Sequence, residues 1–245
     1  MALLEVEGVS KSFRGLRAVA GASFSIERHT IGALIGPNGA GKTTLFNLIA
    51  GTYRPDEGQI RFRGRAIGGL APHRVCAAGI ARTFQLVRPF GDLSVLDNAV
   101  VGALNCERTV AGARARASAV LARLGMGDKA SLIASHLTLA DRRRLEVARA
   151  VATRPSLLLL DEMMAGLRPA EVDELVTMLR TAQREEGMTI LLTEHVMRAV
   201  LALADQIVVL HHGEVIARGA PAAVLREPAV LESYLGEDAL DGAGA

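Results

Sequence analysis

Alternating apolar and polar residues open the chain and predict antiparallel strands there. Residues 3–9 alternate in this way, and Phe24 and Ile26 continue the pattern after a turn expected at Gly21. Short apolar runs predict further strands, at residues 31–35, 59–62, 156–160, 189–193, 207–210 and 215–217. The run at 156–160 is apolar enough for a strand buried on both faces of a parallel sheet.

Helical patterns fill the stretches between these strands. A helix is expected within residues 36–50, closed by Gly51. Others are expected at residues 72–78, 95–104, 111–124, 139–152, 170–186 and 196–204. No strand is expected between 72 and 145, which predicts a helical insertion in an α/β core. We expect a core of residues 3–84 and 153–236, a helical subdomain at about 85–152 and a mobile acidic tail at 237–245.

Composition limits the classes of protein that the chain fits. Its 245 residues, half of them apolar, suffice for one large α/β domain or a domain with a subdomain. A net charge of +2 is too small to predict a nucleic-acid partner. Cys76 and Cys106 form no C-x-x-C pattern, which favours a reduced cytosolic setting. The first residues show no basic stretch followed by a long apolar run, so we expect no signal peptide. No apolar run is long enough to span a bilayer, so we expect any membrane role to depend on a partner.

Residues 36–44 read G-P-N-G-A-G-K-T-T and lie between an expected strand and an expected helix. In that context the pattern G-x-x-x-x-G-K-[ST] predicts a phosphate-binding loop, whose amides and helix N-terminus attract an anion. Lys42 is placed to reach the β- and γ-phosphates, and the Thr43 hydroxyl to bind Mg²⁺. A chance match in a chain with 25 glycines is the alternative, but the flanking elements favour a nucleotide site.

Two acids follow the apolar run at 157–160 and suggest the second half of a nucleotide site. Parallel strands deliver such side chains to the carboxyl edge of the sheet, beside a phosphate loop. We expect Asp161 to hold Mg²⁺ and Glu162 to accept a proton from the attacking water. An ordinary strand end with a solvated acidic pair is the alternative, which the upstream loop disfavours.

In their order and spacing these motifs resemble the ATP-binding subunits of ABC transporters, over about residues 3–236. Residues 81–85 match the family's Q-loop, which implies that Gln85 contacts Mg²⁺ and the attacking water. His195, after an expected strand, resembles the switch histidine, which suits a γ-phosphate sensor. Phe13 stands where an aromatic ring stacks on adenine. Taken singly, these three residues also fit a surface amide, a capping histidine and a packed ring.

The resemblance implies an α/β fold: a P-loop NTPase (RecA-like) core with an antiparallel β-subdomain and an inserted helical subdomain. It implies ATP and Mg²⁺ as cofactors and ATP hydrolysis as the activity. The implied catalytic residues are Lys42, Gln85, Glu162 and His195, and the implied Mg²⁺ ligands are Thr43, Gln85 and Asp161. The implied ATP-binding residues are Phe13, Gly36, Pro37, Asn38, Gly39, Ala40, Gly41, Lys42, Thr43 and Thr44.

The chain departs from the family at positions that act on a partner. The family's signature, L-S-G-G-Q, binds the nucleotide of the opposing subunit, and here residues 137–141 read L-T-L-A-D. Thr138 keeps a hydroxyl for the γ-phosphate, Leu139 and Ala140 replace both glycines, and Asp141 carries a negative charge. The three arginines at 142–144 are expected to offset that charge, or simply to form a solvated face. Arg168 replaces the D-loop aspartate, so the departures concern the partner's site.

Short strings resemble the ATPases of branched-chain amino-acid uptake systems: A-R-T-F-Q at 81–85, A-G-L at 165–167 and L-E-S-Y-L-G at 231–236. This resemblance implies a second ABC ATPase subunit in a homo- or heterodimer, two membrane permeases and, indirectly, a periplasmic solute-binding protein. It implies a location on the cytoplasmic face of the inner membrane, held there by the permeases.

Three alternatives remain open from the sequence. The chain fits the ATPase of another solute system. It also fits a regulatory subunit that hydrolyses ATP weakly beside an active partner. A soluble ABC ATPase that acts on DNA or ribosomes is disfavoured, because the chain has neither tandem ATPase units nor a strong positive charge.

Overall fold

The computed structural model describes residues 2–83 and 89–241, with the side chains of 2–83 and 89–234. The chain divides into two compact units. Residues 1–72 and 191–245 form the first unit, and residues 73–190 form the second. The second unit is larger than the helical insertion expected at about 85–152, because it also includes strands on either side of those helices. As a domain boundary, that expectation stays a prediction.

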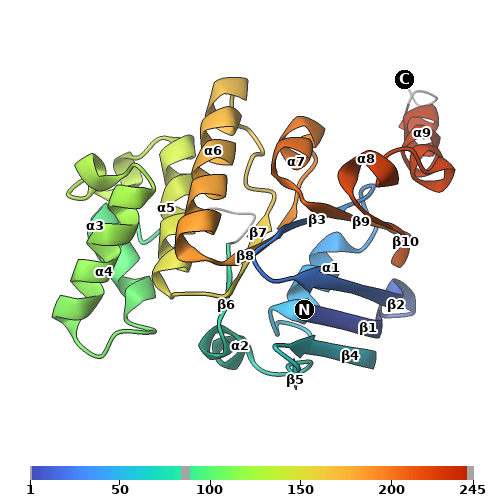
Figure 1. Ribbon diagram of the computed structural model, residues 1–245, viewed down its shortest axis with the longest axis horizontal. Coiled ribbons are helices and arrows are strands. Elements are labelled where there is room, and N and C mark those ends of the chain that lie inside the picture. Colours follow the sequence, from blue (N-terminus) through green and yellow to red (C-terminus); the bar gives the residue numbers. More distant parts are fainter. Residues whose placement is uncertain (1, 84–88, 242–245) are drawn as a thin grey trace. The chain divides into compact units, whose positions relative to one another are not determined.

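An antiparallel sheet forms the start of the first unit, as the alternating pattern predicts. Its strand order is β2 (Leu16–Glu27), β1 (Ala2–Phe13), β4 (Glu57–Phe62) and β5 (Arg65–Ala66). Figure 1 shows β1, β2 and β4 side by side. The alternation places one set of apolar side chains in the core, among them Leu4, Phe24 and Ile26. This sheet confirms the expected antiparallel β-subdomain.

The turn expected at Gly21 is wrong. The chain reverses at Arg14 and Gly15, and Gly21 lies inside β2 with a φ of +64°. The pairing of β1 with β2 shifts register between Val9 and Lys11, and the Gly21 amide donates to the Ser10 hydroxyl at 3.0 Å. Gly21 therefore marks a bulge, where a single residue in the left-handed region keeps the strand continuous.

Parallel strands complete the first unit. β3 (Ile31–Ile35) pairs in parallel with β9 (Gln206–His211), which pairs antiparallel with β10 (Glu214–Gly219). All five residues of β3 are buried, as its uniformly apolar sequence predicts. The helices of this unit are α1 (Lys42–Ile49), α7 (Met197–Leu203), α8 (Pro221–Val224) and α9 (Pro228–Asp241). Gly51, at φ +78°, follows the last turn of α1 as expected. Helix α9 continues to Asp241, so part of the expected tail is helical.

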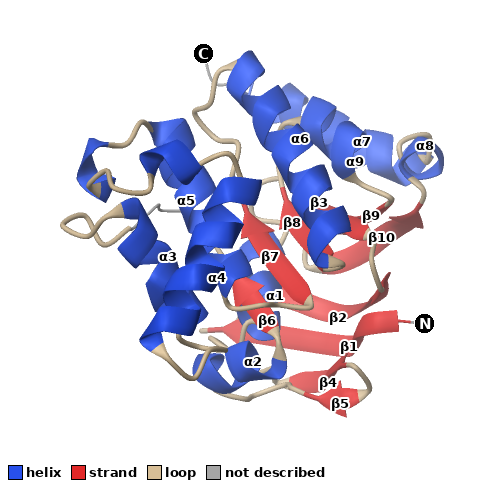
Figure 2. Ribbon diagram, turned by 60° about the vertical axis from the view of Figure 1, so that its left-hand side comes forward, coloured by secondary structure: helices blue, strands red, loops and turns tan. Residues whose placement is uncertain are grey.

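The second unit combines helices with short parallel strands. β6 (Ile80–Arg82) pairs in parallel with β7 (Leu157–Asp161). Its helices are α2 (Pro72–Ala78), α3 (Val95–Ala103), α4 (Val110–Arg123), α5 (Leu139–Ala152) and α6 (Pro169–Glu186), with short 3-10 turns η1 (Gly127–Lys129) and η2 (Ala134–His136). Helices α3, α4 and α5 pack against one another (Figure 2). The boundary between the units falls within β8 (Thr189–Thr193).

The expectation that no strand interrupts the helices between 72 and 145 is wrong, because β6 does. Only three residues form this strand, which is too few for an alternation to reveal. Ile80 and Ala81 are both buried, and the pairing with β7 orders the segment. The strand is thus set by its tertiary partner rather than by local sequence.

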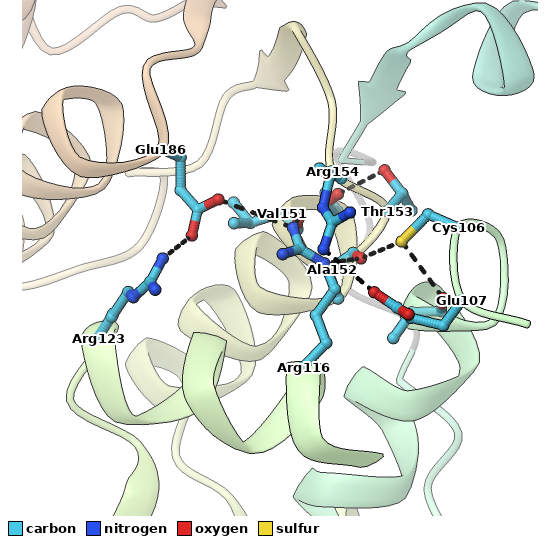
Figure 3. Close-up of polar contacts among 11 residues, drawn as sticks. Cys106, Glu107, Arg116, Arg123, Val151, Ala152, Thr153, Arg154 and Glu186 are labelled. Atoms are coloured by element: carbon cyan, nitrogen blue, oxygen red, sulfur yellow. Dashed lines mark hydrogen bonds and ion pairs between the residues drawn. The ribbon is translucent and has the colours of Figure 1, made fainter. Parts of the chain in front are cut away.

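A polar cluster fixes the C-terminal end of α5 (Figure 3). The Arg116 guanidinium, from α4, donates to the backbone oxygen of Ala152 at 2.8 Å and of Val151 at 2.9 Å. These oxygens belong to the last turn of a helix, where carbonyls lack partners within the helix and carry partial negative charge. Glu186, at the end of α6, forms ion pairs with both Arg116 and Arg123. One arginine therefore joins three helices of the second unit.

Candidate functional site

The loop between β3 and α1 has the geometry of an anion cradle. Gly36 and Gly41 have φ values of +148° and +101°, which L side chains rarely adopt. A Cβ on Gly36 would lie 1.9 Å from the backbone oxygen of Leu210, and one on Gly41 would lie 2.3 Å from that of Ala18. No side chain fits at either position, so the loop requires glycine there for both its conformation and its packing. Helix α1 starts directly after Gly41, so its N-terminal amides face the loop.

Lys42 lies over this loop rather than in solvent. Its Nζ donates to the backbone oxygen of Gly36 at 2.6 Å and of Pro37 at 2.8 Å, and the residue is 6% exposed. A buried ammonium held by carbonyl oxygens is a localised positive charge at the mouth of an amide-lined loop. Thr43, one residue further along α1, is exposed. Its hydroxyl is accessible to an incoming ligand, as a role in binding Mg²⁺ requires.

An aromatic pair lies at the end of β1. The ring of Phe13 meets that of Tyr53 edge to face, with centroids 5.1 Å apart, and both side chains are more than a third exposed. The Lys11 ammonium lies 5.5 Å from the Phe13 ring. Sequence reasoning predicted Phe13 and missed Tyr53, which no local pattern around residue 53 identifies. Two exposed rings in contact fit a surface for a planar base.

Asp161 ends β7 and is buried, with 2% of the residue exposed. Its Oδ2 accepts from Arg82 Nη2 at 2.8 Å, and its amide donates to the Thr83 hydroxyl at 3.3 Å. Both partners follow from the parallel pairing of β6 with β7. Sequence reasoning missed Arg82 because it considered the string at 81–85 only for Gln85. Gln85 and Phe84 lie outside the described residues.

Glu162 follows Asp161 with an unusual backbone conformation, at φ +48°. For a residue with a side chain, the left-handed region costs about 1 kcal/mol or more, and such strain is concentrated at functional sites. Glu162 is half-buried, whereas His195, which follows β8 closely, is exposed. The histidine is therefore at the surface of the first unit, as a residue that senses a bound ligand must be.

The segment at 138–141 forms the first turn of α5, and we call it the signature segment. Thr138 is the N-cap of the helix. Its hydroxyl accepts from the Asp141 amide at 3.2 Å and donates to Asp141 Oδ2 at 3.0 Å. Lys129 Nζ, in η1, lies 2.7 Å from the other oxygen, Oδ1. Leu139 is 44% exposed at the tip of the helix.

One cation that pairs with Asp141 lies outside the arginine triplet, and the expected role of the triplet stays a prediction. Lys129 forms the ion pair with Asp141. Arg142 donates to the backbone oxygen of Ser135 at 2.8 Å, and Arg144 pairs with Glu174 on α6. Arg142 directly follows Asp141, so about 100° of helix rotation separates the two side chains. Arg144 shares the face of Asp141, but its guanidinium pairs with Glu174.

Arg168, in place of the family's D-loop aspartate, caps α6. Its amide donates to Glu171 Oε2 at 2.9 Å, and its guanidinium donates to Oε1 of the same residue at 2.8 Å. These hydrogen bonds hold the pKa of the Glu171 carboxyl below its usual range. The arginine side chain is largely exposed, so a positive charge stands on the surface next to the helix start.

Each unit holds one group of the predicted residues. The first unit contains Phe13, the phosphate loop at 36–44 and His195, and the second contains Asp161, Glu162 and the signature segment. Within the described residues, Lys42 donates to backbone oxygens of the phosphate loop, and Arg82 of β6 donates to the Asp161 carboxylate.

A family model described as ABC transporter matches residues 19–165 of the chain. The chain belongs to the ABC transporter family. This membership makes it an ATP-binding, ATP-hydrolysing cassette, as the motifs predict. A second model, described as branched-chain amino acid ATP-binding cassette transporter, matches residues 214–239, which include β10 and most of α9.

Curated relatives of this ABC cassette cover nearly its whole length. The high-affinity branched-chain amino acid transport ATP-binding protein BraF of Pseudomonas aeruginosa is 38% identical over 96% of this chain and 98% of its own. The corresponding protein LivG of Escherichia coli K12 has the same identity and coverage. A probable LivG of Archaeoglobus fulgidus is 34% identical over 96% of both chains.

Solved ABC cassettes share the fold. The crystal structure of a nucleotide-free ATP-binding cassette from an ABC transporter has a TM-score of 0.87 and 29% identity, and covers 96% of this chain and 99% of that one. The crystal structure of the ADP conformation of another ATP-binding cassette has the same TM-score and coverage at 28% identity. These likenesses confirm the predicted P-loop NTPase fold. Among the described residues of this ABC cassette, no helix is both long and apolar enough to cross a bilayer.

Proposed function

We propose that this ABC ATPase powers the import of branched-chain or related amino acids. The observation that carries the proposal is the identity of about two residues in five, over 96% of the chain, to proteins named for high-affinity transport of these amino acids. The match of the branched-chain cassette model to residues 214–239 supports the same substrate class from a separate part of the chain.

In the proposed reaction, the phosphate loop binds the triphosphate of ATP. Loop amides and the N-terminus of α1 face the anion, and Lys42 adds a localised charge that is already directed at the loop. Phe13 and Tyr53 offer the surface for adenine. Since phosphoryl transfer asks little covalent chemistry of the protein, position and charge supply most of the rate.

The donor set fits Mg²⁺, which prefers hard oxygen ligands. Asp161 offers a buried carboxylate at a strand end and Thr43 an accessible hydroxyl, and we assign both, with Gln85, as ligands. When bound, Mg²⁺ would neutralise charge on the phosphates. Asp161 already pairs with a cation, Arg82, so its environment accommodates positive charge.

Glu162 is assigned as the base that accepts a proton from the attacking water, and His195 as the group that orients the γ-phosphate. The strained backbone of Glu162 supports the first assignment, because such strain persists where function requires it. The exposure of His195 supports the second.

The proposed assembly pairs the chain with a second ABC ATPase subunit, either a copy or a relative. The pair would act beneath two permeases on the cytoplasmic face of the inner membrane, served indirectly by a periplasmic binding protein. Membership of the transporter family supports this arrangement.

The test combines purification and uptake. We expect the tagged chain to copurify from membranes with permease subunits, and its deletion to abolish uptake of labelled leucine, isoleucine and valine. We expect Glu162→Gln to retain ATP, stop turnover and fail to restore uptake. Unchanged ATPase activity of the Glu162→Gln complex would remove Glu162 as the base. Normal amino-acid uptake in the deletion strain would instead assign the cassette to another solute.

A second candidate function is a regulatory subunit with weak hydrolysis at one of two unequal sites. The signature segment favours it, because Thr138 already uses its hydroxyl proton on Asp141. The number of nucleotides retained per Glu162→Gln complex distinguishes a fully active ATPase from a regulatory subunit. Retention at a single site would favour the regulatory subunit.

A further inference from the structure

The signature segment places a carboxylate where, under the proposed function, the partner subunit's triphosphate approaches. Asp141 is only 9% exposed, and its side chain is held at the tip of α5 by Thr138. An acid in the first turn suits the helix on its own, because the N-terminus favours negative charge. Near a triphosphate the same charge repels the ligand, since like charges disfavour each other most where solvent is excluded.

Lys129, which lies outside α5, forms an ion pair with the Asp141 carboxylate. It reaches Asp141 from η1, twelve residues earlier in the chain, at 2.7 Å. Together, Lys129 and Thr138 occupy both carboxylate oxygens, so the Asp141 charge is fully partnered. The side chains of Lys129 and Asp141 are 31% and 12% exposed, so solvent screens this pair only in part. Of the basic residues that follow Asp141, Arg142 donates to the backbone oxygen of Ser135 and Arg144 pairs with Glu174.

From this geometry we infer that Lys129 is a positioning and charge-compensating residue of the signature segment. By neutralising Asp141 it lets the first turn of α5 face an anionic nucleotide bound to the partner subunit. The inference rests on the proposed function, in which two cassettes enclose ATP. In the family's signature an uncharged glutamine stands at the position of Asp141, and here the Lys129–Asp141 ion pair takes its place.

The same pair has a purely structural interpretation, in which it merely fixes η1 to α5. The two interpretations differ when both charges are removed. A structural latch is lost equally in Lys129→Met and in Lys129→Met/Asp141→Asn. Charge compensation is needed only while the carboxylate remains, so Asp141→Asn should rescue Lys129→Met. The asparagine keeps the size of the side chain and an oxygen that accepts from Thr138.

The experiment uses the complex copurified from membranes and measures its KM and kcat for ATP, with thermal unfolding as a second readout. We expect Lys129→Met to raise KM about tenfold, which corresponds to about 1.4 kcal/mol. The double variant should match Asp141→Asn within about twofold and have a clearly lower KM than Lys129→Met, since neither leaves an uncompensated carboxylate. Arg114→Met is the matched control, because it removes the cation of an exposed ion pair with Asp97 in the same unit.

Each outcome decides the question. Rescue of KM by the double variant, at equal unfolding temperatures of the two Lys129 variants, supports compensation. Three results overturn it. The double variant has a KM as high as that of Lys129→Met, Lys129→Met has the KM of the parent, or Asp141→Asn has a KM as high as that of Lys129→Met. The parent complex is assayed first. If it neither hydrolyses ATP nor copurifies with permeases, the proposed function fails and the inference falls with it. If it does both, only the role of Lys129 is in question.

Discussion

At the scale of single residues, the phosphate loop depends on glycines that accept no side chain. Gly41 combines a left-handed backbone with a backbone oxygen, that of Ala18, 2.3 Å from the place of a Cβ. Backbone cannot rotate away as a side chain does, so the loop itself would have to move. Its amides would then lose the orientation that attracts phosphate.

We therefore expect Gly41→Ala to cost about 3 kcal/mol of folding free energy and to abolish ATP binding. Gly64→Ala is the control, because Gly64 also has a positive φ, +73°, but open space around it. That variant should lose about 1 kcal/mol and keep full ATP affinity. Urea denaturation and titration calorimetry measure both quantities. Normal ATP affinity in Gly41→Ala would contradict the cradle geometry.

Residue identity alone predicted the chemistry of the loop and of the two acids, since each motif contains its own flanking strand and helix. Partners from distant segments were not predictable. Arg82, Tyr53 and Lys129 are fixed by strand pairing, ring contact and a 3-10 turn. Nothing in the local pattern distinguishes these residues from solvated side chains, because their roles depend on tertiary neighbours.

At the scale of elements, side chains fix helix α5 at both ends, its own at the start and one from α4 at the end. Thr138 and Asp141 close its first turn, and Arg116 binds its last carbonyls (Figure 3). The sequence predicted the bounds of this helix from its apolar period, at 139–152, and the structure confirms them. The Arg116 clamp was not predictable, because an arginine on α4 resembles any solvated basic residue.

We expect Arg116→Met to lower the free energy of unfolding by about 2 kcal/mol, because two carbonyls at the end of α5 lose a charged donor. Arg123→Met is the matched control, since Arg123 shares Glu186 but is 47% exposed. An exposed ion pair contributes little, so that variant should lose less than about 1 kcal/mol. The urea midpoint with far-ultraviolet circular dichroism provides the measurement. Equal losses in the two variants would show that Glu186, not the end of α5, is what Arg116 stabilises.

At the scale of the whole molecule, ligand binding links the phosphate loop to global stability. Nucleotide at one hundred times its dissociation constant should add about 2.7 kcal/mol. For a chain of this size that raises the unfolding temperature by roughly 5–10 °C. Differential scanning fluorimetry with Mg²⁺ and ADP tests this, and Gly41→Ala is the negative control. No shift at millimolar ADP would contradict nucleotide binding by the isolated cassette.

The fold class was predictable at this scale because strand and helix patterns alternate as in other α/β proteins. The division into units was not, since compactness depends on contacts between distant segments. The strand β6 and helices α8 and α9 were missed for lack of a clear period in short or mixed segments.

The first unit is made of two separate stretches, residues 1–72 and 191–245, with the second unit between them. During synthesis the whole second unit leaves the ribosome before the chain that completes the first. Strand β3 therefore emerges long before its partner β9, at residues 206–211, exists. Until then the edge of β3 that pairs with β9 stays open, and an open apolar edge exposes the nascent chain to aggregation. In vivo yield should accordingly depend more on chaperones that hold the N-terminal quarter than on those that act after release.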